Sequence, residues 1–96
     1  MSYKAPVEQI DFILTHVVPF GELSRTERFA EATAETATAI LSEAGKMASN
    51  VLAPLNMAGD SHPARLENGV LRSSPGFAEG FRAIADGGWV GVSADP

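Results

Sequence analysis

Apolar residues recur at helical spacing in the first two-thirds of the chain and predict two helices. The first runs from about Pro6 to Val18, since proline suits a first helical turn and Pro19 ends the run. The second is the longest, begins after the N-cap residue Thr33 and continues towards Pro54. Its apolar stripe consists of Ala37, Ile40, Leu41, Ala44, Ala48, Val51, Leu52 and Leu55.

Local signals between these helices predict how the chain turns and packs. Ser24 and Glu27 have the spacing of a capping box, which predicts a short helical turn from Ser24 to about Glu31. Gly45 lies among small residues of the long helix, so we expect another helix to cross closely there. Pro54 should end or bend the regular hydrogen bonding, and residues 56–63 then read as a loop.

The last third of the chain predicts a hairpin followed by a helix. Asn68-Gly69 between two short apolar-containing arms is the signal of a two-residue turn that needs positive φ. Ser74-Pro75 is typical of a cap and first turn, and the helix that follows should end at Gly87-Gly88. Its apolar face consists of Phe77, Phe81, Ile84 and Ala85. The predicted fold class is all-α, a small, mainly helical domain with a short β-hairpin.

The composition narrows the possible environment and partners. A chain of 96 residues fits one domain, so we expect all its elements to share one hydrophobic interior. Seven basic against twelve acidic residues give a net charge of −5, which disfavours nucleic acid as a partner. The absence of cysteine fits a reducing compartment, and no apolar run approaches the roughly 20 residues of a membrane span. We therefore expect a cytoplasmic protein that does not cross a membrane.

No residue pattern predicts a catalytic, cofactor-binding or metal-binding site. His16 lacks further ligands at metal spacing and is interpreted as a surface residue. Asp60-Ser61-His62 carries the residue types of a catalytic triad, but neighbours in one turn cannot form a relay, and turn chemistry explains them better. The glycines at 87, 88 and 91 follow a helix rather than a strand, which favours a helix C-cap over a nucleotide-binding loop. Trp89 is expected to fill the core of this domain, the alternative being that it covers a neighbouring domain.

Three stretches of the sequence, in this order and spacing, resemble the acyl-CoA dehydrogenases. They are Tyr3-Lys4-Ala5-Pro6-Val7 through Phe12-Ile13-Leu14, then Val51-Leu52-Ala53-Pro54-Leu55-Asn56 with Gly59-Asp60, and finally Gly87 through Pro96. Pro75-Gly76-Phe77 leads into the last helix in the same way. The similarity covers nearly the whole chain and is greatest to the subgroup with an extra N-terminal helical segment, which includes the 3-methylmercaptopropionyl-CoA dehydrogenases.

The resemblance implies that residues 1–96 are the N-terminal helical domain of such an enzyme, with the middle and C-terminal domains absent. The parent would remove hydrogens from the α and β carbons of an acyl-CoA thioester, using a glutamate base and FAD that lie in the other domains. The resemblance also implies that electron-transfer flavoprotein is the redox partner and that the parent enzyme is a homo-oligomer. The fragment alone is expected to be inactive, contributing to acyl-pocket shielding and subunit packing. The alternative is a free-standing helical interaction module without catalysis, since three helices present more apolar face than one small core requires.

Overall fold

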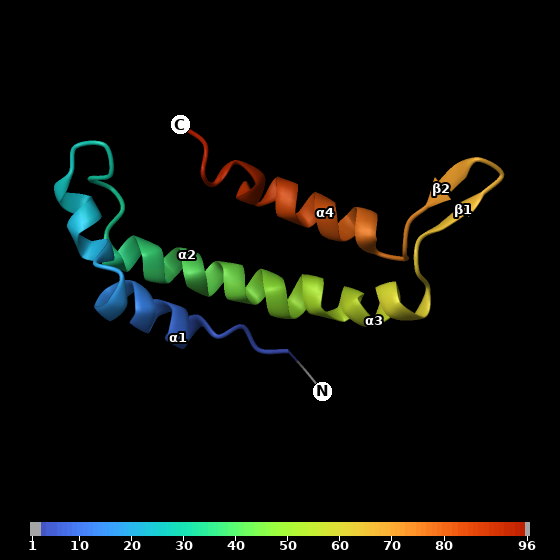
Figure 1. Cartoon of the computed structure of the whole chain (residues 1–96), viewed down its shortest axis with the longest axis horizontal. Helices are drawn as coiled ribbons and strands as arrows, with labels where there is room; N and C mark the ends of the chain where they lie inside the picture. The colour runs from blue at the N-terminus through green and yellow to red at the C-terminus, as the bar shows by residue number, and fades with distance from the viewer. Residues whose placement is uncertain (1–2, 96) are drawn as a thin grey trace. The chain divides into compact units, whose positions relative to one another are not determined.

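The structure, a computed structural model, describes residues 3–95. Within this range it is mainly helical with a two-stranded antiparallel hairpin, which confirms the predicted fold class (Figure 1). Its main elements are α1 (Val7–Phe12), α2 (Ala34–Met47), α3 (Ala53–Ser61), β1 (Arg65–Glu67), β2 (Val70–Arg72) and α4 (Phe77–Asp86). The contacts gather into two compact units, one of residues 4–48 and one of residues 49–95 with residue 3.

The predicted first helix is present, but only its first half is a regular α-helix. The π-helical segment η1 (Ile13–Val17) follows α1 directly, and Val18 N donates to Ile13 O at 2.8 Å. Pro6 precedes the helix as its N-cap residue. The extended conformation of Val18 before Pro19 ends the helix, because the residue before proline disfavours helical backbone angles. The predicted span is therefore confirmed.

Helix α1 packs against α2 at the glycine that the sequence marked for a close crossing. A Cβ placed on Gly45 would lie 2.8 Å from Val7 Cγ2, so only glycine permits this approach. The Thr38 hydroxyl also donates to Asp11 Oδ1 at 2.9 Å, which links the two helices through polar side chains. Thr33 caps α2 as predicted, since its hydroxyl accepts from Thr36 N at 3.2 Å.

The capping box predicted at Ser24 does not form, and this prediction is wrong. The segment is instead the 3-10 helix η2 (Phe20–Arg25), followed by turns up to residue 31. The Ser24 hydroxyl donates back to Gly21 O at 2.9 Å, so Ser24 completes the turn before it rather than opening the one after it. Thr26, which lies within the predicted box, accepts from Phe29 N at 3.3 Å and so organises the following turn.

Residues 56–63 are mostly helical, so the predicted loop is also wrong. The π-helical segment η3 (Ala48–Leu52) follows α2, and α3 then continues to Ser61. Pro54 lies in the first turn of α3, where a missing N–H removes no required hydrogen bond. The wider π-helical turn before Pro54 accommodates the change in hydrogen bonding that a proline imposes. Helical structure therefore continues through Pro54.

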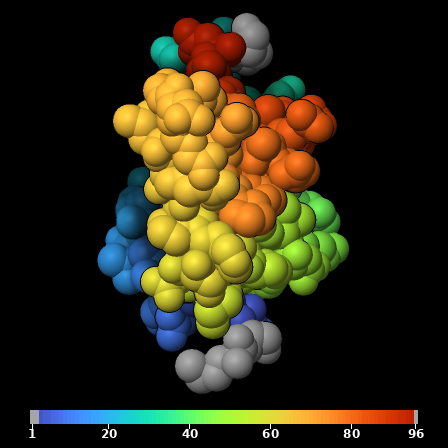
Figure 2. Space-filling view, turned by 90° about the vertical axis from the view of Figure 1, so that its right-hand side faces the viewer, coloured from blue at the N-terminus to red at the C-terminus, as the bar shows by residue number. Residues whose placement is uncertain are grey.

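The hairpin has the register that its turn residues predict. Leu66 pairs with Leu71 across the two strands, and the turn residues Asn68 and Gly69 have φ angles of 51° and 78°. This confirms the predicted two-residue turn, whose central residues both need positive φ. In the space-filling view the hairpin lies at the surface turned towards the viewer (Figure 2).

Helix α4 begins two residues later than predicted and ends as predicted. Gly76, with φ of 84°, occupies the N-cap position instead of Ser74, because Pro75 and Gly76 form a turn in which Phe77 N donates to Ser74 O at 3.2 Å. At the other end Gly87 caps the helix and Gly88 is left-handed, with φ of 79°, before the 3-10 helix η4 (Trp89–Gly91). The helix C-cap interpretation of these glycines is confirmed.

The prediction of one shared hydrophobic interior is wrong for residues 3–95. None of their hydrophobic side chains is fully buried, and even Trp89, predicted to fill the core, is only half-buried. Each compact unit brings together too few helices to enclose a side chain on all sides. The apolar stripes predicted from the sequence are therefore largely open to contact.

Candidate interaction surface

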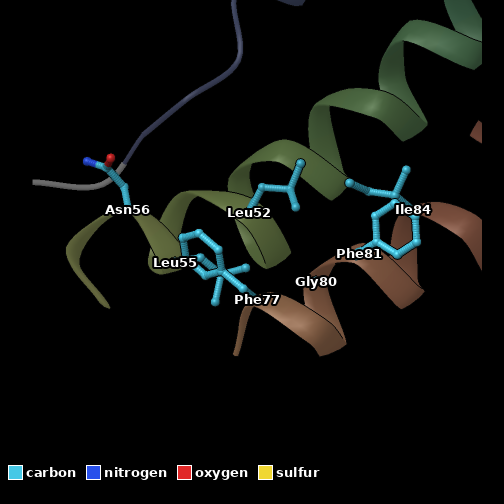
Figure 3. Close-up of a pocket in the computed structure, with 7 residues that line it drawn as sticks. All are labelled: Leu52, Leu55, Asn56, Phe77, Gly80, Phe81 and Ile84. Carbon is cyan, nitrogen blue, oxygen red and sulfur yellow. The ribbon is translucent and has the colours of Figure 1, made fainter. Parts of the chain in front are cut away.

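An apolar groove runs between α3 and α4. Its volume is about 360 Å³, within the range of small-molecule and peptide pockets. The lining residues come from η3, α3 and α4 and are Leu52, Leu55, Asn56, Phe77, Gly80, Phe81 and Ile84 (Figure 3). Phe81 is 65% exposed although it lines the groove. The groove is therefore a surface on which an apolar partner would remove much area from water.

The two helices that form the groove approach closely because glycines face a leucine and a phenylalanine. Gly80 is buried, and a Cβ placed there would lie 2.5 Å from Leu55 Cδ1. A Cβ on Gly76 would lie 2.7 Å from Leu55 Cδ2, so each methyl group of Leu55 occupies space that a glycine leaves open. On the facing helix, a Cβ on Gly59 would lie 2.8 Å from Phe77 Cζ. These glycines set the separation of α3 and α4 and hence the width of the groove.

A second apolar surface lies on α1 in the other unit. Phe12 and Ile13 line a shallow depression of about 410 Å³ together with Glu8 and Gln9. Phe12 is 60% exposed and its ring lies 4.7 Å from the ring of His16, measured between centroids. This surface therefore combines apolar side chains with a polar edge.

The hairpin presents a third apolar surface. Leu66 and Leu71 form a cross-strand pair on one face of the ribbon, and both are more than 70% exposed. The other face carries ion pairs, with Arg65 Nε at 2.6 Å and Arg72 Nε at 4.0 Å from the carboxylate of Glu67. A two-stranded ribbon is marginally stable alone in water, so a covered leucine pair would stabilise it.

The structure places the chemically suggestive residues of the sequence on the surface. His16 is exposed at the end of η1, as predicted. Asp60, Ser61 and His62 are all exposed at the end of α3, where His62 N donates to Ala58 O at 2.9 Å as an ordinary helix end. Over residues 3–95 no group of three or more histidine, aspartate or glutamate side chains is placed to hold a metal ion.

Neither the groove nor the glycine segment after α4 fits FAD. A dinucleotide diphosphate is typically held by backbone N–H groups at a helix start after a strand, or by cations. The groove offers apolar side chains and the amide of Asn56, and the glycines at 87 and 88 follow a helix. We therefore assign no flavin contact to these two places.

Sequence reasoning identified most of the groove but missed two of its residues. The apolar spacing predicts the stripes that contain Leu52, Leu55 and the α4 face, whereas Pro54 predicts a loop at Asn56. Gly80 was not singled out, although a glycine inside a predicted helix is the same signal that located the crossing at Gly45.

Among residues 3–95, no helix is both long and apolar enough to span a bilayer.

The fold and its exposed apolar surfaces are those of a small helical domain whose apolar faces are open to contact. The comparisons then give a particular relative: the chain is similar to 3-methylmercaptopropionyl-CoA dehydrogenase of Ruegeria pomeroyi, with 32% identity over 93 residues. This match confirms the resemblance to acyl-CoA dehydrogenases. It covers 97% of this chain but only 16% of the length of that relative. No family model matches the chain.

Proposed function

We propose that residues 1–96 are the N-terminal helical domain of an FAD-dependent acyl-CoA dehydrogenase whose chemistry resides in further domains. The observation that carries the proposal is the 93-residue match to a dehydrogenase about six times as long as this chain. The exposed apolar groove and the exposed leucine pair of the hairpin fit a domain whose faces are covered by other parts of a larger protein.

The role proposed for this domain is acyl-pocket shielding and subunit packing. Phe81 is 65% exposed, so burial of the exposed part would contribute at most about 3 kcal/mol, taking roughly 25 cal/mol per Å² of apolar surface and a side chain of roughly 200 Å². Apolar contacts at the groove, the hairpin and α1 would favour packing of the domain against its neighbours. They require no catalytic side chain from this chain.

The proposed reaction of the parent is α,β-dehydrogenation of an acyl-CoA thioester. The relative is named for 3-methylmercaptopropionyl-CoA, and we propose the broader class of acyl-CoA thioesters as substrate here. The proposal includes electron-transfer flavoprotein as electron acceptor, a homo-oligomeric assembly and a cytoplasmic location. The absence of cysteine is consistent with that location.

The test compares the 96-residue chain with the longest natural protein that contains its sequence. Both are purified and assayed for flavin absorbance and for acyl-CoA-dependent reduction of a dye. We expect a colourless, inactive short chain and a yellow, active long protein. Turnover by the short chain would overturn the proposal, because it would require a base within residues 1–96.

A pair of variants tests the role of the groove in the long protein. Phe81→Ser should reduce the thermal stability and flavin content of the long protein, because a partly exposed groove side chain would lose its contact with the covering domain. Arg82→Ser changes the neighbouring exposed residue of α4, which does not line the groove, and should have little effect. Equal effects of the two variants would argue against coverage of the groove.

The second candidate is a free-standing helical interaction module without catalysis. The same exposed apolar faces favour it, because contiguous apolar surface marks protein-binding sites. The intact mass of the protein from its native source separates the candidates. A mass near 10.1 kDa would favour the module, whereas a mass several times larger would favour the dehydrogenase.

A further inference from the structure

We draw no further inference here: the strongest candidate, the apolar groove between α3 and α4 lined by Leu52, Leu55, Phe77, Phe81 and Ile84, belongs to the surface already described, and nothing in the structure shows what covers it.

Discussion

Replacing Gly80 with alanine tests whether glycine sets the distance between α3 and α4. Two effects oppose each other in Gly80→Ala. Alanine favours the helix by about 1 kcal/mol over glycine, whereas overpacking of a close contact costs about 1–3 kcal/mol. The added Cβ would lie 2.5 Å from Leu55 Cδ1, a separation that forces a shift. Leu55 Cδ2 also lies close to where a Cβ of residue 76 would be, 2.7 Å from that position, so a shift of Leu55 would disturb its packing against Gly76.

We therefore expect Gly80→Ala to destabilise the packing of α3 and α4 by about 1 kcal/mol. Amide hydrogen exchange followed by mass spectrometry measures this locally, since exchange in α4 reports its opening free energy. A loss of about 1 kcal/mol corresponds to roughly fivefold faster exchange. Gly21→Ala is the matched control, because a Cβ there meets nothing within 4 Å, and exchange in α4 should not change.

The decisive comparison is the same substitution in a Leu55→Ala background. Without the Leu55 methyl groups, the added Cβ meets Leu52 Cδ2 at an ordinary 3.8 Å, and the helix propensity of alanine should dominate. Gly80→Ala should then slow exchange in α4 instead of accelerating it. Faster exchange in both backgrounds would refute the contact with Leu55 as the cause. Slower exchange in both would show that Leu55 moves aside without cost.

Three further predictions concern single features of the fold. Thr33→Ala should destabilise the start of α2 by about 1 kcal/mol, because it removes the hydroxyl that accepts from Thr36 N. Amide exchange in the first turn of α2 should become faster, whereas Thr33→Ser, the control, should be tolerated. Asn68→Ala should weaken the hairpin by about 1 kcal/mol, because residue 68 has a positive φ that alanine disfavours. Asn68→Gly should preserve the cross-strand contacts seen by NMR. Equal behaviour of the two variants would contradict the turn geometry. Glu43→Gln should change thermal stability by less than about 1 kcal/mol, since its ion pair with Lys46 is 65% exposed on both sides, and a larger loss would indicate a contact beyond this pair.

The sequence predicted those elements whose signals are local. Asn68 and Gly69 determine a turn within two residues, and Thr33 determines a helix start within one turn, so neither depends on distant packing. Gly45 was informative for a related reason, because glycine inside a helix has a cost that close packing compensates. Its partner, Val7 of α1, required the structure.

The errors arose where one residue type serves two local structures. Ser24 has the spacing of a helix cap, but its hydroxyl completes the preceding turn instead, and sequence spacing does not distinguish these hydrogen bonds. Pro54 signals a helix end, yet the same residue is well suited to a helix start. The choice depended on the π-helical turn before it, which no propensity predicts.

The apolar stripes connect the sequence to the proposed function. An apolar helix face favours burial against another surface, but the stripe alone does not identify that surface. In α4 the stripe was read correctly from its spacing, and the structure places Leu55 against its glycines while leaving Phe81 65% exposed. Packing within this chain therefore explains the part of the α4 face at its glycines, but it does not explain the exposed part at Phe81. The groove that Phe81 lines has mainly apolar side chains, which fit an apolar contact. For this reason the reaction proposed here rests on the dehydrogenase match, and the groove supports only the role of a domain that packs against others.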